Sequence, residues 1–286
     1  IHFDFSKNRK PQNLKTYSGS IEEDEQLLDR LCAEGLPYRY EEVNDSIKSR
    51  LNKELDLIKK MGFVSYFLIN WDIVSEARRR GFFYVGRGSG ANSIVAYLLR
   101  ITDVDPMELD LYFERFINLY RANPPDFDID FSWRDRPAMT QYIFDRFNHV
   151  ALLGTYVTFK QRGVIRELGK VFGLPPQDID FLLTGRYVLD QLDHVSKIVL
   201  KYGSLLKGKP NYLSIHAGGI LISDKPLHWF SATHLPPKGF PTTQYDMVIA
   251  EDVGLYKFDI LGQRGLGKIK EALKNIKRSI STTSKD

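Results

Sequence analysis

The sequence contains almost no cysteine and no long apolar run. Cys32 is the only cysteine among 286 residues, so an internal disulfide is excluded and a reducing compartment is the simplest interpretation. No stretch of about 18 uninterrupted apolar residues occurs, which predicts the absence of a membrane span. The chain begins with Ile1 instead of Met, and residues 1–6 do not resemble a signal peptide. We therefore expect either a processed chain or an excerpt of a longer one.

The net charge is also small. Lys and Arg number 40 against 36 Asp and Glu, a formal charge of +4, which permits a polyanionic partner without requiring one. The 43% of hydrophobic residues suffices for a sizeable core, and the length predicts about two domains.

Hydrophobic spacing predicts an α+β protein. A capping-box pattern at Ser20 and Glu23 predicts a helix that stops at Gly35. Strand-type and helix-type patterns then follow one another along the chain. Further helices are predicted over 45–62, 64–80, 91–100, 136–147, 161–172 and from 265, helical fragments with loops over 175–214, and strands over 82–85, 126–131, 150–159, 216–223 and 255–261.

A glycine-rich loop, Gly86-Arg87-Gly88-Ser89-Gly90, joins a predicted strand to a predicted helix. Unpaired N–H groups at a helix N-terminus favour an anion, and glycines allow its close approach. The loop lacks the Gly-Lys-Ser/Thr ending of a Walker A motif and the spacing of a dinucleotide-binding loop. It is therefore either a phosphate-binding loop or an ordinary tight turn.

An acidic strand pattern follows at Asp126, Asp128 and Asp130, which alternate with three apolar residues. Carboxylates at i and i+2 on one strand face can share a divalent cation such as Mg²⁺. The alternatives are a solvated face, or pairing with Arg134 and Arg136 just downstream.

A further carboxylate, Asp259, interrupts the late apolar run 255–261, and Lys257 shares its face. A buried lone Asp is costly unless it is paired or bound to a cation, so Asp259 either joins the acidic site or simply pairs with Lys257. His216 precedes a glycine pair and is interpreted as structural. Asp178 and Asp180 form a second D-x-D pattern, but they lie at a predicted helix start, where acidic residues are favoured anyway.

Six spaced motifs together resemble the bacterial C-family DNA polymerases, the DNA polymerase III alpha subunits. The resemblance covers roughly residues 25–275. The motifs are VGRGSGANS at 85–93 with AYLL at 96–99, ITDVDP at 101–106, FERF at 113–116, PDFDIDF at 125–131, HAGG at 216–219 and KFDILG at 257–262.

The resemblance implies a palm domain of the DNA polymerase beta-like nucleotidyltransferase type, with a mixed sheet and helices, and an inserted, mainly helical thumb. It implies that Asp126, Asp128 and Asp259 bind two Mg²⁺ ions and carry catalysis, with Asp130 as a supporting carboxylate. The triphosphate of a dNTP would lie against the glycine loop. The implied nucleotide-binding residues are Arg87, Gly88, Ser89 and Lys257.

The implied domains are a connector or the end of a PHP domain (1–45), a first palm segment (46–157), the thumb (158–214), a second palm segment (215–270), and the start of the fingers or a disordered tail (271–286). A basic helix face in the thumb suits a duplex backbone, since phosphate contacts position DNA without reading its sequence. The residues expected to bind DNA there are Lys160, Arg162, Arg166 and Lys170.

The implied function is template-directed DNA synthesis from dNTPs on primer–template DNA, in the bacterial cytoplasm and associated with the nucleoid. Sliding-clamp and other replisome contacts would belong to regions outside this chain. Because the fingers normally complete the nucleotide pocket, we expect the isolated chain to extend primers poorly. The alternatives are a DNA-binding module without catalysis and a D-x-D phosphotransferase or glycosyltransferase that acts on a sugar nucleotide.

Overall fold

The protein is described here by a computed structural model that covers residues 11–112, 124 and 126–283, with the side chains of 277–283 left aside. The FERF motif at 113–116 lies outside the described residues. The chain divides into two compact units, one made of Ile1–Leu153 with His216–Asp286 and one of Gly154–Ile215. The second unit covers nearly the same residues as the predicted thumb, whose name stays a prediction. We describe each unit by itself.

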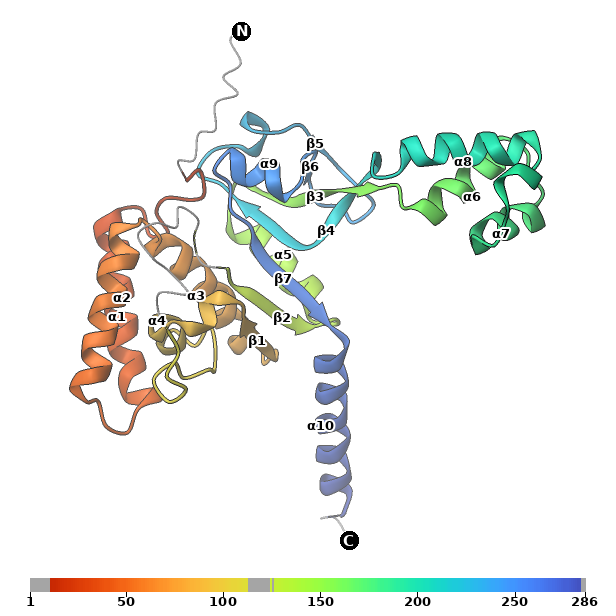
Figure 1. Cartoon of the computed structure of the whole chain (residues 1–286). Helices are drawn as coiled ribbons and strands as arrows, with labels where there is room; N and C mark the ends of the chain where they lie inside the picture. Colours follow the sequence, from red (N-terminus) through yellow and green to blue (C-terminus); the bar gives the residue numbers. More distant parts are fainter. Residues whose placement is uncertain (1–10, 113–123, 125, 284–286) are drawn as a thin grey trace. The chain divides into compact units, whose positions relative to one another are not determined.

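Three helices open the first unit: α1 (Ile21–Arg39), α2 (Asp45–Lys60) and α3 (Val64–Arg79) (Figure 1). The predicted cap is present, because the Ser20 hydroxyl accepts a hydrogen bond from the Glu23 N–H at 3.2 Å. Asn44 caps α2 in the same way. Most residues of α3 are buried, which makes it the central helix of this unit.

Helix α1 continues past Gly35, so the predicted stop is wrong. A Cβ on Gly35 would lie 2.5 Å from the Leu98 carbonyl oxygen. Gly35 is therefore a point of close approach between α1 and α4 (Ile94–Leu98), and the glycine reflects tertiary packing, not a helix end.

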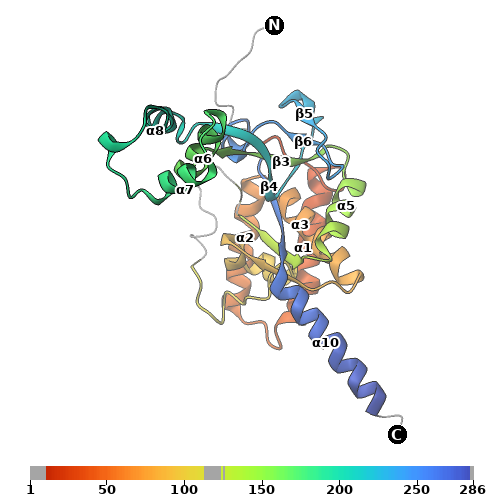
Figure 2. The same ribbon diagram turned by 90° about the vertical axis from the view of Figure 1, so that its right-hand side faces the viewer.

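The first unit contains a mixed seven-stranded sheet in the order β1-β2-β7-β4-β3-β6-β5, with all its strands labelled in Figure 1. Figure 2 shows β3, β4, β5 and β6 from a second side. Strand β2 pairs antiparallel with β1 and parallel with β7, and β7 pairs antiparallel with β4. The chain leaves this unit within β3 and returns within β4. The strands are β1 (Tyr84–Arg87), β2 (Asp128–Ser132), β3 (Val150–Thr158), β4 (Pro210–Ile222), β5 (Thr233–His234), β6 (Thr242–Thr243) and β7 (Phe258–Gln263).

Aromatic packing joins α3 to the centre of this sheet. The Tyr66 ring stacks on Phe127 at 5.8 Å and lies 4.8 Å from Phe258, centroid to centroid. Phe127, Ile129 and Phe131 are each at most 1% exposed. The apolar half of the acidic strand pattern thus faces the core, as predicted, and the carboxylates take the other side.

The remaining helices of the first unit agree with the prediction only in part. α5 (Arg136–Arg146) agrees, whereas the helix predicted over 91–100 is a 3₁₀ turn, η1 (Ser89–Asn92), followed by the five-residue α4. A short helix, α9 (Met247–Asp252), precedes β7. The last helix, α10 (Arg264–Thr283), begins one residue before its predicted start at 265. Among the residues that the structure describes, no helix is long and apolar enough to cross a membrane.

The second unit is helical: α6 (Gln161–Val171), α7 (Pro176–Thr184) and α8 (His194–Leu206). Ile165, Leu182 and Val199, one from each helix, form its small core. The glycine cap at Gly185 has a positive φ of 71°, which ends α7 in the left-handed conformation.

We expect Gly35→Ala to destabilise the first unit by about 1–3 kcal/mol, because the new methyl group would overpack a contact with backbone atoms that cannot move aside. Thermal unfolding should show a fall in Tm on the order of 5 °C. Gly265→Ala is the matched control, since a Cβ there meets nothing within 4 Å. An unchanged Tm in Gly35→Ala would contradict the close approach.

Candidate active site

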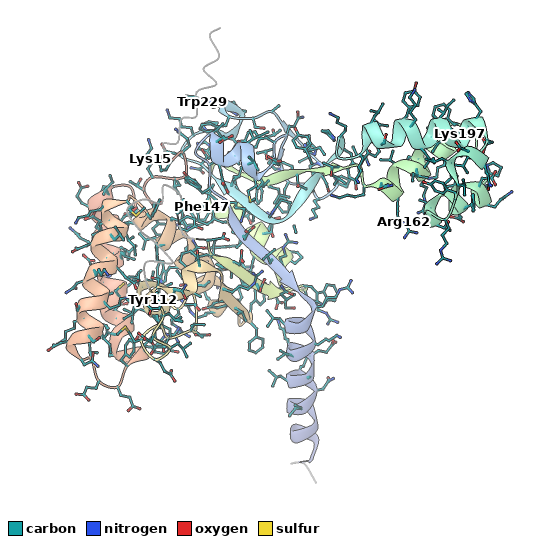
Figure 3. The ribbon with its side chains drawn as sticks, viewed as in Figure 1. Lys15, Tyr112, Phe147, Arg162, Lys197 and Trp229 are labelled. Atoms are coloured by element: carbon teal, nitrogen blue, oxygen red, sulfur yellow. The ribbon has the colours of Figure 1, made fainter. Side chains whose placement is uncertain are left out.

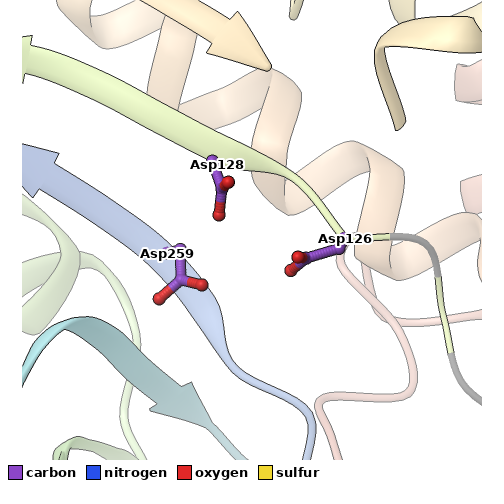
Figure 4. Close-up of side chains that lie close together, drawn as sticks. All are labelled: Asp126, Asp128 and Asp259. Carbon is purple, nitrogen blue, oxygen red and sulfur yellow. The ribbon is translucent and has the colours of Figure 1, made fainter. Parts of the chain in front are cut away.

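Three carboxylates from β2 and β7 meet on one face of the sheet (Figure 4). The parallel pairing of the two strands puts Asp128 directly opposite Asp259. Asp126 lies two residues before Asp128, ahead of the strand, and its carboxylate points toward the other two. One oxygen from each of the three lies within 4.8 Å of the others. The sequence prediction named these three residues, and the structure brings them together.

The carboxylates differ in exposure. The side chains of Asp259, Asp128 and Asp126 are 6%, 15% and 49% exposed. Oδ1 of Asp259 is buried and has no hydrogen-bond partner among the described residues. An unpaired buried carboxylate oxygen is costly, and three converging carboxylates are the donor set that hard cations such as Mg²⁺ prefer. The residues therefore fit a divalent cation.

Two basic side chains offset the acidic cluster. Arg87 donates to Asp128 at 2.6 Å and to Asp130 at 2.7 Å. Lys257 lies 3.4 Å from Asp126 and also donates to Asp259. Lys257 is therefore shared between two carboxylates from different elements, so it does more than pair with its neighbour in sequence.

The alternative pairing with Arg134 and Arg136 is wrong. Arg134 pairs with Glu271 at 3.3 Å on the surface. Arg136 donates to backbone carbonyls, among them that of Ile260 at 2.8 Å. The nearest basic residues in sequence thus have other partners, and the cation that reaches the strand comes from the glycine loop.

The close approach of these charged groups shifts their pKa values. Burial, then the charge of Asp126, raise the pKa of Asp128 to about 6, and Arg87 opposes the rise. Burial acts to lower the pKa of Lys257, but its contacts with Asp259 and Asp126 outweigh burial and raise it. The hydrogen bond to Asp130 raises the pKa of Arg87. Both cations therefore stay charged beside the carboxylates.

The glycine loop lies directly against Asp126. The Ser89 hydroxyl accepts the Asp126 N–H at 3.2 Å, and the Gly90 N–H donates to the Asp126 carbonyl at 3.1 Å. Gly88 has a φ of +96°, and a Cβ there would lie 2.5 Å from the same carbonyl oxygen. The loop thus holds the backbone of a candidate ligand. Because α4 is short and starts at Ile94, the argument from a helix dipole is weaker than the sequence suggested.

His216 borders the site from β4. Its Nδ1 accepts hydrogen bonds from the N–H groups of Gly219 at 2.8 Å and Gly218 at 3.3 Å. Burial lowers the pKa of His216, although Asp259 opposes this. Nδ1 lies 3.8 Å from Oδ1 of Asp259 but cannot donate to it while it accepts two backbone N–H groups. This geometry explains how the oxygen is left unpaired.

A buried ion pair behind the glycine loop escaped the sequence analysis. Glu54 is fully buried and accepts from Arg50 at 2.6 Å and from the Ser93 hydroxyl at 2.7 Å. Arg50 also donates to the Asn92 carbonyl at 3.2 Å. Glu54 occupies a core position of the α2 apolar stripe, between Leu51 and the next buried turn. An acidic residue at an otherwise apolar position of a helix is the sequence signal that could have revealed this ion pair.

The basic residues predicted to bind DNA lie in the second unit. Three of them follow one another at spacings of four on α6, and all four are exposed; Figure 3 shows Arg162 on this helix. They are Lys160, Arg162, Arg166 and Lys170. This unit carries nine Lys and Arg against five Asp and Glu. Asp178 and Asp180 lie exposed on α7 and belong to the second unit, whereas the three carboxylates belong to the first.

Comparison with known proteins shows the family. The model of the bacterial DNA polymerase III alpha NTPase domain matches residues 26–262. The chain belongs to this family.

Similar proteins include the DNA polymerase III subunit alpha of Bacillus subtilis, 37% identical over 91% of this chain, and that of Borreliella burgdorferi, 37% identical over 90%. The error-prone DNA polymerase of Symbiobacterium thermophilum is 36% identical over 87% of the chain. The aligned region covers 26%, 24% and 25% of those proteins, respectively. The chain thus spans about a quarter of the length of these relatives.

The crowding of carboxylates predicts a gain in stability for Asp128→Asn without metal. Because the pKa of Asp128 in the folded protein, about 6, lies above its ordinary value of 3.8, ionisation favours the unfolded chain. This penalty is absent below about pH 4, grows between pH 4 and 6, and is complete above. In EDTA at pH 7.5, Asp128→Asn should therefore raise Tm by about 3 °C, and the gain should vanish near pH 4.

The exposed Asp56→Asn on α2 is the control, and its Tm should follow that of the wild type at both pH values. A lower Tm for Asp128→Asn at pH 7.5 would show that the Arg87 pair outweighs the repulsion.

Proposed function

We propose that this chain is the palm and thumb core of a DNA polymerase III alpha subunit, which transfers nucleotides from dNTPs to a primer 3′-hydroxyl. The observation that carries the proposal is the convergence of Asp126, Asp128 and Asp259 around a buried, unpaired Asp259 oxygen. Membership in a family whose relatives are named DNA polymerases supports it.

The three aspartates would hold two Mg²⁺ ions, the second arriving with the dNTP. Bound Mg²⁺ would lower the pKa of the primer hydroxyl and stabilise charge on the leaving pyrophosphate. The protein supplies position: β2 and β7 fix two carboxylates in register, and the glycine loop fixes the third through the Asp126 backbone.

The nucleotide would lie beside this cluster. Gly88 permits close approach of a triphosphate, while Ser89 offers a hydroxyl. Arg87 and Lys257 remain charged next to the carboxylates and can each receive a phosphate oxygen. Both cations already lie between acidic groups, so a triphosphate with its cations would compete with these ion pairs.

Primer–template DNA would contact the second unit, proposed as the thumb. Its excess of positive charge and the row of cations on α6 favour a sequence-independent phosphate contact. The bacterial cytoplasm and the nucleoid would be the place of action. Because the chain spans about a quarter of its relatives, we consider a second function as well: binding of DNA without catalysis.

Replacing Asp259 separates these two functions. Asp259→Asn should abolish the Mg²⁺-dependent rise in Tm and the Mg²⁺-dependent binding of dNTP, because the negative charge is lost and an NH₂ group replaces one carboxylate oxygen, while DNA binding stays unchanged. Differential scanning fluorimetry and fluorescence anisotropy with labelled primer–template DNA measure the three quantities. Asp56→Asn is again the matched control.

Retention of both Mg²⁺ and dNTP binding in Asp259→Asn would overturn the catalytic proposal. Wild-type protein that binds DNA but shows no Mg²⁺ or dNTP response would favour the DNA-binding module.

The basic face of α6 predicts a salt-dependent DNA contact. Replacing Arg162, Arg166 and Lys170 by Gln should weaken DNA binding uniformly across sequences and reduce the slope of log Kd against log salt by up to about 3. The control removes three exposed cations from helices of the first unit, namely Arg30, Lys48 and Lys53. Equal losses in both triple variants would reduce the effect to net charge and contradict the proposed contact.

A further inference from the structure

Arg87 contacts two carboxylates, and only one of them belongs to the candidate metal cluster. Its Nη1 contacts Asp128 at 2.6 Å and its Nε contacts Asp130 at 2.7 Å. Asp128 belongs to the candidate metal cluster, whereas Asp130 is not one of its three members and accepts a hydrogen bond from Gln263 at 3.2 Å. One guanidinium thus joins a candidate metal ligand to a carboxylate that is not one.

The two contacts are not equally easy to break. The Asp130 side chain is 9% exposed and receives Arg87 through Nε, with a second, longer contact from Nη2 at 3.5 Å. The contact with Asp128 uses Nη1 alone. A rotation about the last bonds of Arg87 would release Asp128 while Asp130 keeps its partner. A buried Asp130 without a cationic partner would be costly, so we expect the contact between Arg87 and Asp130 to persist.

We propose that Arg87 is an internal counter-ion that competes with Mg²⁺ for Asp128, and that Asp130 is the positioning residue that retains Arg87 when Mg²⁺ takes its place. The proposal rests on the proposed function, since it assumes that the three aspartates bind the cation. In the metal-free protein Arg87 offsets the charge of Asp128. Once released, Nη1 stays beside the cluster and is free to receive an anionic group such as a phosphate oxygen.

The competition makes a prediction that is opposite to the usual loss of function. Arg87→Gln should lower the Mg²⁺ concentration at the midpoint of stabilisation, measured without nucleotide by scanning fluorimetry, by about three- to tenfold, the scale of a partly exposed ion pair. The same variant should bind dNTP more weakly in saturating Mg²⁺, because a phosphate contact is lost. Asp130→Asn should raise the Mg²⁺ midpoint, because Arg87 then has only Asp128 to pair with.

A double variant avoids leaving a buried charge unpaired and tests whether Asp130 acts through Arg87. Arg87→Gln alone leaves the buried Asp130 without its cation, whereas Arg87→Gln with Asp130→Asn removes both charges. If Asp130 acts through Arg87, the double variant should keep the lowered Mg²⁺ midpoint of Arg87→Gln. Arg134→Gln is the control for charge, since Arg134 is 55% exposed and its ion pair is with the exposed Glu271.

The outcomes separate the two proposals. No Mg²⁺ response in the wild type would overturn the proposed function, and the inference with it. A Mg²⁺ response that needs Asp259, combined with an unchanged or raised midpoint in both Arg87→Gln and the double variant, would overturn the counter-ion alone. An equal lowering in Arg134→Gln would do the same, because the effect would then be one of net charge.

Discussion

The parallel pairing of β2 with β7 is the constraint on which the site depends. It sets Asp128 opposite Asp259, two like charges on neighbouring strands, in an arrangement that is unfavourable by itself. A slip of one residue would turn the Asp259 carboxylate into the core and an apolar side chain into the site. Every other feature of the site either fixes this register or offsets its electrostatic cost.

The register is fixed from the apolar side. Phe127 and Phe258 pack against Tyr66 of α3 on the face opposite the carboxylates. Burying such a side chain contributes about 1.5–3 kcal/mol, and several aromatic and aliphatic residues do so here. The repulsion among the acids is reduced by Arg87, Lys257 and partial exposure to water. Apolar packing therefore offsets the repulsion and keeps the carboxylates in register.

Sequence reasoning reached the parts of the site that are local. The alternation from Asp126 to Phe131 is visible in six consecutive residues, and it correctly predicted one acidic and one apolar face. Asp259 was visible as a break in an apolar run, but its register with Asp128 depends on pairing between residues 131 positions apart. The loop Gly86–Gly90 was found by composition, although its hydrogen bonds to Asp126 are tertiary.

The errors arose where local and tertiary causes give the same pattern. Gly35 matched a helix stop but serves a close approach to α4, and only the position of Leu98 distinguishes the two. Arg134 and Arg136 were nearest in sequence to the acids, whereas Arg87 reaches them because β1 is the antiparallel neighbour of β2. Distance along the chain is a poor guide to ion pairs between strands.

The distribution of charge between the units strengthens the case for a cation at the carboxylate cluster. The second unit has nine basic and five acidic residues, which leaves 31 of each sign from the chain's 40 and 36. The whole net charge of +4 therefore lies in the second unit, and the first unit has no excess with which to attract a polyanion. Its acidic cluster would repel a triphosphate. Nucleotide binding beside Asp126, Asp128 and Asp259, as proposed, would benefit from added positive charge, because the charges of Arg87 and Lys257 are partly offset by their carboxylate partners. In the proposed function, a divalent cation would provide both the charge and the release of these two side chains from the carboxylates.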